Sequence, residues 1–135
     1  MNTRDTIEEL FRRMGAGDPD GIAALHAERV DWKVNWPAGE AAAIPWIRDW
    51  STRADIAEFH RALAAAFVPG EDAVSVERVL VDGPDAVVLG ETARTFRSTG
   101  KRFTMMFALH LTVQNGLISR YHVYEDSLAV ARAFA

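Results

Sequence analysis

The segment FTMMFALHLTVQNGLISRYHVYE, residues 103–125, carries the strongest structural signal in the chain. Its side chains alternate with period two, which is typical of half-buried strands. The dipeptide Asn115-Gly116 divides the segment, and Asn-Gly favours the two-residue turn of a β-hairpin. We therefore expect two antiparallel strands, Phe103 to Val113 and Leu117 to Glu125.

Two more strands are predicted immediately before this hairpin. Val74 to Val81 and Ala86 to Arg97 share the period-two pattern, and turn residues occupy both junctions, at 82–85 and at Thr99-Gly100. Further upstream, residues 31–36 carry tryptophan or valine at every second position, which predicts a fifth strand. The chain is therefore expected to contain a meander of four strands and one earlier strand.

Three helices are expected in the first half of the chain. Apolar residues at helical spacing predict one helix from Ile7 to Met14. Asp18 can cap a second, short helix. A third helix opens at Ser51-Thr52 and ends before Pro69-Gly70. Residues 128–134 are expected to form a short closing helix or a tail.

The order of these elements predicts the fold class. Helices followed by an antiparallel meander indicate an α+β fold with the helices packed on one face of the sheet. The length of 135 residues fits a single domain, residues 1–135, with one core. Three helices do not fill a strongly curved sheet, so we expect a cavity between the layers. The loop at 37–50, which contains Trp46 and Trp50, is long enough to form a lid or a wall of that cavity.

The composition excludes several functional classes. The net charge of -4 disfavours nucleic acid as a partner, because phosphate binding needs clustered Lys and Arg. The chain has no cysteine, which excludes disulfides, thiolate metal sites and cysteine nucleophiles, and its histidines lack a metal-ligand spacing, so no metal is expected. No apolar run is long enough to span a bilayer, and Met1 to Leu10 lacks the apolar core of a signal peptide. We therefore expect a cytoplasmic protein with no membrane contact.

The turns predict which side chains share a face of the sheet. A two-residue turn at Asn115-Gly116 places His110 opposite Tyr121 and Ala108 opposite Val123, and directly opposed residues share a face. A second two-residue turn at Thr99-Gly100 extends this register to the preceding strand. One face of the sheet then carries Glu91, Met106, Ala108, His110, Tyr121, Val123 and Glu125. The other face then carries Thr92, Arg94, Phe107, Leu109, Leu111, His122 and Tyr124. A bulge would exchange these assignments, because a shift of one residue inverts the faces.

Recognisable motifs are spread over nearly the whole chain. They are MGAGD at 14–18, LHAE at 25–28, VDWKV at 30–34, TRADIAEF at 52–59, NGLI at 115–118 and YHVYEDSL at 121–128. Together they resemble the nuclear transport factor 2-like superfamily and its SnoaL-like branch. The resemblance implies a cystatin-like fold, in which a curved antiparallel sheet and three N-terminal helices surround a cone-shaped cavity. It also implies a homodimer formed through the convex face of the sheet.

The resemblance transfers few catalytic residues to this chain, and the superfamily holds isomerases, cyclases, epoxide hydrolases, dehydratases and non-enzymes. Ketosteroid isomerase-like members use a tyrosine, a carboxylate base and a protonated aspartate, and limonene epoxide hydrolase-like members use an aspartate on the last strand. The corresponding residues here are Leu10, Val34 or Trp36, Ala108 and Val123. SnoaL-like polyketide cyclases use an acidic residue near the end of the last strand, where this chain has Glu125 and Asp126.

Because Ala108 corresponds to an inward position in those relatives, its face is predicted to line the cavity. The candidate catalytic residues are Glu125 and Glu91, which would take a proton, and His110 and Tyr121, which would stabilise an oxyanion. The candidate ligand-binding residues are Trp32, Val34, Trp36, Trp46, His60, Met106, Ala108 and Val123. Structural alternatives are a solvated strand end for Glu125, an ion pair for Glu91, satisfied buried histidines for His110 and His60, and core packing for the tryptophans.

These candidates lead to three functional hypotheses. The first is a SnoaL-like pocket protein for a small apolar, aromatic or cyclic molecule, with isomerase or cyclase chemistry by proton transfer and no cofactor. The second is a non-catalytic ligand-binding module. The third is a dimeric interaction module whose pocket is filled by tryptophans. An inward carboxylate with a raised pKa would favour the first hypothesis over the second.

Overall fold

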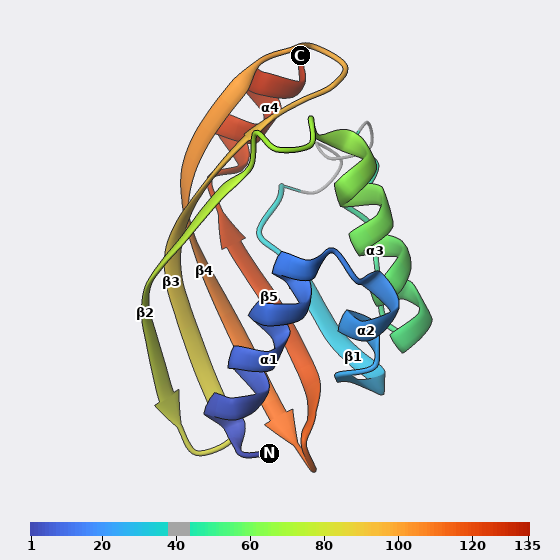
Figure 1. Cartoon of the computed structure of the whole chain (residues 1–135), viewed down its shortest axis with the longest axis vertical. Helices are drawn as coiled ribbons and strands as arrows, with labels where there is room; N and C mark the ends of the chain where they lie inside the picture. Colours follow the sequence, from blue (N-terminus) through green and yellow to red (C-terminus); the bar gives the residue numbers. More distant parts are fainter. Residues whose placement is uncertain (38–43) are drawn as a thin grey trace.

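A computed structural model describes residues 1–37 and 44–135 of the chain, so the predicted loop at 37–50 lies partly outside the described residues. The chain forms a five-stranded sheet, with α1 and α2 before the first strand, α3 between the first and second strands, and α4 after the last strand (Figure 1). The elements are α1 (Thr3–Ala16), α2 (Pro19–Ala23), β1 (His26–Val34), α3 (Arg53–Ala66), β2 (Ala73–Asp82), β3 (Asp85–Thr95), β4 (Arg102–Gln114), β5 (Leu117–Glu125) and α4 (Ser127–Phe134). In these described ranges, no helix combines the length and the hydrophobicity needed to cross a bilayer.

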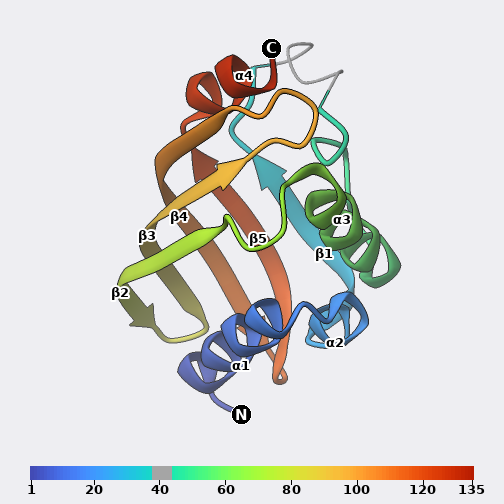
Figure 2. The ribbon, with the colours of Figure 1, turned by 45° about the horizontal axis from the view of Figure 1, so that its top comes forward.

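The sheet is curved and does not close on itself. Its strand order is β1-β5-β4-β3-β2, and α1, α2 and α3 lie over its concave side (Figure 2). The predicted α+β class with a curved sheet and three N-terminal helices is therefore confirmed. The prediction of a wholly antiparallel sheet needs one correction, because β1 pairs with β5 in parallel. The alternation within a strand carries no information on the direction of its partner.

Local sequence signals set the ends of the helices. The Asn2 side chain accepts a hydrogen bond from the backbone of Asp5 at the start of α1, and Gly17 ends the helix in the left-handed conformation. Asp18 caps α2 as predicted, by accepting a hydrogen bond from the Gly21 backbone at 3.0 Å. At the start of α3, Thr52 and Asp55 form a reciprocal capping box.

Replacing Thr52 with Ala is expected to lower the free energy of unfolding by about 1 kcal/mol. The Thr52 hydroxyl accepts the Asp55 backbone N–H at 3.2 Å, and alanine would leave that donor without a partner. Urea denaturation of the variant measures the change. Ser51→Ala is the matched control, because Ser51 contributes only its backbone N–H to Asp55. An equal loss in both variants would contradict the capping role.

A β-bulge near the last hairpin changes the face that β5 presents. The pairs Gln114–Leu117 and Val113–Ile118 have the predicted register. The next pair is Thr112–Arg120, so Ser119 is left unpaired. From that point on, each β5 side chain shares a face with the β4 side chains that the predicted register had put on the opposite face, so Tyr121 lies beside Leu111 instead of His110. The β3–β4 register differs from prediction by two residues, which leaves the faces of those strands unchanged.

Two clusters of buried side chains form the core on the concave side. One packs α1, α2 and the first half of α3 against the sheet around Leu10, Ile56 and Leu111. The other surrounds Phe96 and includes Trp46. The candidate site lies at the boundary of the two clusters, because its lining residues come from both.

Candidate functional site

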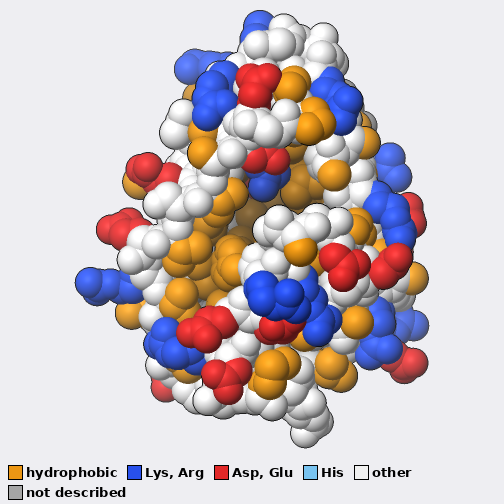
Figure 3. Space-filling model, in the orientation of Figure 1, with side chains coloured by type: hydrophobic (Ala, Val, Ile, Leu, Met, Phe, Trp, Pro, Cys, Tyr) orange, Lys and Arg blue, Asp and Glu red, His pale blue; other side chains and the backbone are white. Residues whose placement is uncertain are grey.

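A pocket lies between the concave face of the sheet, α1, α3 and the segment that contains Trp46 and Ile47. Its volume of about 110 Å³ compares with the roughly 150 Å³ of an apolar cavity that binds benzene. The walls are mainly hydrophobic, and Figure 3 shows the hollow with its hydrophobic lining. The size and the lining suit a single-ring, largely apolar molecule.

Stacked aromatic side chains build one side of this pocket. Trp32 of β1 lies parallel to Tyr121 of β5, with ring centroids 4.5 Å apart and planes 2° apart. Trp32 also contacts Phe59 of α3 at 4.5 Å. Trp46 packs against Phe67 with ring centroids 5.2 Å apart, and such aromatic pairs contribute about 0.5–1.5 kcal/mol beyond the burial of apolar area. These contacts give the pocket a preformed wall.

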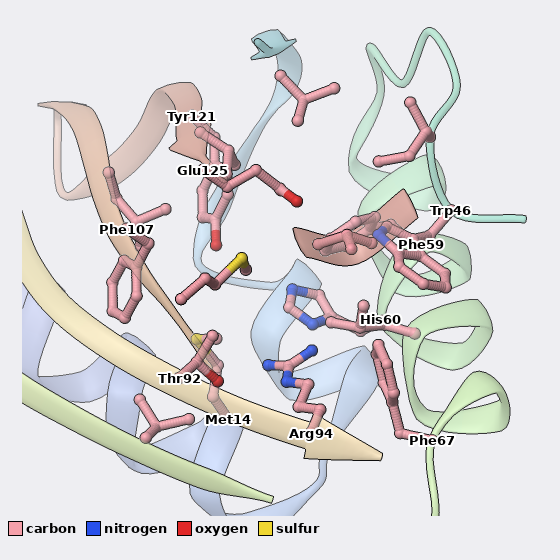
Figure 4. A pocket seen from close by; sticks show the side chains of 18 of the residues that line it. Met14, Trp46, Phe59, His60, Phe67, Thr92, Arg94, Phe107, Tyr121 and Glu125 are labelled. Atoms are coloured by element: carbon pink, nitrogen blue, oxygen red, sulfur yellow. The ribbon is translucent and has the colours of Figure 1, made fainter. Parts of the chain in front are cut away.

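Glu125 enters the pocket from the end of β5 (Figure 4). Its backbone is held by Asn35: the Glu125 N–H donates to Asn35 Oδ1 at 2.8 Å, and Asn35 Nδ2 donates to the Glu125 carbonyl at 3.1 Å. Burial raises the pKa of the Glu125 carboxyl above its usual value. Two neighbours act against that rise in pKa, the Trp36 indole and the Arg94 guanidinium. The Trp36 N–H itself lies outside hydrogen-bonding geometry. A carboxyl in this setting can exchange a proton nearer to neutral pH than a solvated one.

The Tyr121 hydroxyl is the second group suited to proton chemistry. Tyr121 is 3% exposed, and burial raises its pKa to about 12. The phenol therefore keeps its proton at neutral pH and can donate a hydrogen bond to an oxygen in the pocket. It shares this wall with Glu125, which is four residues further along the same strand face.

A further wall of the pocket carries three polar groups that lack protein partners. Thr92 and Arg94 share one face of β3, and His60 projects from α3 (Figure 4). Thr92 Oγ1, Arg94 Nε and His60 Nε2 are buried without a hydrogen-bond partner among the described residues. Burial lowers the pKa of His60 to about 3, so its imidazole is neutral at pH 7. The pocket thus combines one cation and two neutral polar groups on this wall.

Seven of the twelve predicted site residues line the pocket. They are Trp32, Val34, Trp46, His60, Tyr121, Val123 and Glu125. Trp36 is not a lining residue and packs beside the Phe96 cluster, next to Glu125. Asp126, the other acidic candidate, accepts the Ala129 backbone N–H at 3.1 Å and caps α4. Of these two acidic residues, Glu125 therefore lies in the pocket.

The predicted inward orientation of Glu91, His110, Met106 and Ala108 is wrong. These residues lie on the convex face of the sheet, because the opposite face of β3 and β4 lines the pocket. Met106 is 73% exposed, and His110 contacts Asp85 on that outer surface at 3.0 Å. The error came from using Ala108 as the inward marker.

Phe107, Leu109 and Leu111 were predicted to lie on the convex face, and this prediction is also wrong. Phe107 and Leu109 line the pocket, and Leu111 is fully buried in the core. Tyr124, assigned to the same face, does lie on the convex side and is 51% exposed. The bulge at Ser119 separates Tyr124 from Leu109, which the predicted register had placed on one face.

Thr92 and Arg94 are polar pocket residues that were predicted to lie on the wrong face. A signal for them was present in β4. Its odd-numbered positions from 103 to 111 are all strongly apolar, whereas Thr104, Ala108 and His110 occupy even-numbered ones. The more apolar face of a strand faces the core. With that face turned inward, the hairpin pairing brings Thr92 and Arg94 inward as well.

Comparison with known proteins relates this chain to a family. The model of the SnoaL-like domain matches residues 7–121, which leaves Glu125 just outside the matched range. No curated protein matches the chain. Among solved structures, a nuclear transport factor 2-like protein from Burkholderia thailandensis is 20% identical, with a TM-score of 0.84 over 100% of this chain and 98% of that chain.

Two further solved structures share the fold. TerC, co-crystallised with polyporic acid, is 20% identical with a TM-score of 0.80, covering 97% of this chain and 96% of that one. A protein from Catenulispora acidiphila with a ketosteroid isomerase-like fold, in complex with trimethylamine, is 11% identical with a TM-score of 0.78, covering 97% and 92%. At these identities the similarity establishes the fold and leaves the reaction open.

Proposed function

The chain belongs to the SnoaL-like domain family, and on that premise we propose that it binds a small, single-ring carbonyl compound and moves a proton on it without a cofactor. The SnoaL-like and nuclear transport factor 2-like fold is shared with isomerases and polyketide cyclases. The observation that carries the proposal is the position of Glu125. It is a carboxyl whose pKa is raised by burial, on the wall of an apolar pocket.

The proposed step is proton abstraction next to a carbonyl group. The ionised Glu125 carboxylate takes a proton from the α-carbon, and the electron pair of that C–H bond forms the C=C bond of an enolate, which places the negative charge on the carbonyl oxygen. The Tyr121 hydroxyl donates a hydrogen bond to that oxygen. Glu125 then returns the proton to another carbon of the same conjugated system, which is an isomerisation. Atoms and charge balance without any further reactant.

Proton exchange with solvent tests this proposal without knowledge of the natural substrate. Cyclohexanone and phenylacetone are single-ring ketones with exchangeable α-protons and suit the size of the pocket. NMR in D₂O would follow the incorporation of deuterium at their α-carbons with and without the protein. Acceleration that depends on Glu125 supports proton transfer. Exchange at the uncatalysed rate with both ketones would count against it and favour a ligand-binding module.

We also propose that two copies of the chain associate through the convex face of the sheet. Large hydrophobic side chains are exposed on this face: Met106 is 73% exposed, Tyr124 51% and Leu80 49%. Their exposure supports the proposal. Met106 and Tyr124 are diagonal neighbours on the same face of β4 and β5. An exposed apolar patch of this kind is typical of interaction surfaces.

Met106→Glu is therefore expected to weaken the dimer at least about tenfold, because it places a charge in the apolar centre of the interface. Size-exclusion chromatography with light scattering gives the molar mass of each variant across a dilution series. Leu128→Glu is the matched control, since Leu128 is 57% exposed but belongs to α4. A wild-type chain that is monomeric at every concentration would rule out this association.

A further inference from the structure

Arg94 is the least compensated charge inside the pocket. Its side chain projects between hydrophobic walls, and its Nε is buried without a hydrogen-bond partner. Among the described residues, no carboxylate lies within 4 Å of its guanidinium, whose packing partner is the Phe67 ring at 5.1 Å. Arginine stays protonated in proteins, so this is a true cation.

A buried cation without a counter-charge destabilises the folded protein. Buried polar groups nearly always have a partner, and an exception commonly marks a missing ligand or water. Here the exception is not isolated, since Thr92 Oγ1 and His60 Nε2 on the same wall also lack partners. His60 and Arg94 are close enough for the guanidinium charge to lower the pKa of the imidazole. The three groups therefore converge on one region of the pocket (Figure 4).

We propose that Arg94, Thr92 and His60 form a subsite for a carboxylate, and that the natural ligand is a single-ring organic acid. The planar guanidinium matches the two oxygens of a carboxylate and can bind both. The Thr92 hydroxyl and the neutral His60 ring supply further hydrogen bonds. The ring of the ligand would then lie along the aromatic wall, where Trp32 stacks on Tyr121.

This inference rests on the proposed function, because it names the class of molecule that the same pocket takes. It also orients that molecule. Arg94 and Glu125 are close enough for their charges to interact, yet they form no ion pair within 4 Å among the described residues. A carboxylate held at Arg94 leaves the opposite end of the ligand facing the carboxyl of Glu125 (Figure 4). The acid group would thus anchor the substrate, and the carbonyl-bearing end would react.

A pair of isosteric ligands tests the subsite directly. Phenylacetate and phenylacetamide have the same ring and shape and differ in charge. Their dissociation constants can be measured by titration calorimetry and by intrinsic tryptophan fluorescence, to which Trp32 and Trp46 in the pocket lining contribute. The wild-type chain is expected to bind phenylacetate at least about tenfold more tightly than phenylacetamide, as a charge-assisted bidentate pair requires.

Variants at position 94 assign this preference to the guanidinium. Arg94→Met should abolish the preference and leave phenylacetamide binding within about twofold of wild type. Arg94→Lys should keep part of it, and circular dichroism would verify that both variants fold. Arg78→Met is the matched control, because Arg78 is an exposed arginine on the neighbouring strand β2, outside the pocket lining. It removes the same charge and should leave the preference unchanged.

Three results would overturn the subsite. They are equal binding of the two ligands by wild type, no measurable binding of phenylacetate, or a preference that persists in Arg94→Met. Equal binding would leave Arg94 as a stabiliser of an oxyanion formed during a reaction. The ketone exchange assay is independent of this one. Exchange without a carboxylate preference removes only the subsite, whereas a carboxylate preference without exchange removes only the proposed proton transfer.

Discussion

Glu125→Gln is expected to lower the rate of protein-catalysed α-proton exchange by a factor of about 10²–10⁴, which is the typical contribution of a positioned general base. Glutamine has nearly the same shape and accepts no proton at neutral pH. The Asn35 hydrogen bonds go to the backbone of residue 125, so they remain in the variant. The measurement is the initial rate of deuterium incorporation, followed by NMR at saturating ketone.

Glu91→Gln is the matched control for this experiment. Glu91 is the other glutamate that the sequence nominates as a base, but it lies on the convex face and is exposed. Its replacement should leave the exchange rate unchanged. A loss in Glu91→Gln with full activity in Glu125→Gln would show that the pocket described here is not the reactive site.

The pH dependence of exchange follows from the same carboxyl. Burial raises the pKa of Glu125, and the ionised form is the base. Activity should therefore rise with pH as Glu125 loses its proton, with a midpoint above the value of about 4.3 for a solvated glutamate. The raised pKa also means that ionised Glu125 destabilises the folded state at neutral pH. Glu125→Gln should consequently be at least as stable as wild type at pH 7, which separates lost chemistry from lost folding.

Acid is expected to destabilise the protein steeply between pH 6.5 and about 4, because two buried histidines remain neutral in the folded state. Burial lowers the pKa of His26 to about 4 and that of His60 to about 3. His26 is fully buried, and its Nδ1–H donates to the Ile22 carbonyl at 2.9 Å. In the unfolded chain both side chains protonate near pH 6.5. The unfolded state then binds more protons than the folded state, so acid favours unfolding.

Each histidine should lower the free energy of unfolding by at most about 1.4 kcal/mol per pH unit, with a smaller slope at both ends of this window. Two such groups give a loss on the order of 3–5 kcal/mol over two pH units, a large part of the stability of a small domain. Carboxylates with lowered pKa values, such as Asp55 and Asp85, contribute mainly below this range. Glu125 acts in the opposite direction, because its pKa is raised.

Urea denaturation at a series of pH values from 7 to 4.5 measures this dependence. His26→Gln and His60→Gln should each remove roughly half of the slope, because glutamine does not titrate. The two variants serve as controls for one another, since His26 lies at the start of β1 and His60 lies on α3. A free energy of unfolding that stays constant over this range would mean that the histidines are solvated.

Local signals in the sequence predicted most of the helices and strands and many of their ends. Period-two alternation, Asn115-Gly116 and the caps at Asp18 and Thr52 act within a few residues of the chain. Such local signals do not depend on the partner that an element finds. The hairpin of β4 and β5 and the helices α1 and α3 therefore match their predicted positions closely. The predictions for α2 and β1 were wrong at their boundary, because α2 ends at Ala23 and β1 already begins at His26, five residues before the predicted strand at 31–36.

Which side chains enter the pocket depends on strand pairing, which the sequence pattern did not reveal. One unpaired residue, Ser119, turned Tyr121 and Glu125 to the face that carries Arg94, away from His110. A bulge leaves no mark in the alternation of β5, because both of its faces contain polar and apolar residues. The prediction reached Glu125 and Tyr121 only because two errors cancelled: the wrong β4 face was taken as inward, and the register of β5 was displaced by one residue.

The grouping of His60, Arg94 and Glu125 also required the fold. They come from α3, β3 and β5, and the curvature of the sheet brings them around one hollow. Capping, turns and periodicity are local interactions, so they can be recognised in the sequence before the fold is known. Strand pairing and sheet curvature decided which of the candidate polar groups share a pocket, because those depend on contacts between residues far apart in the chain.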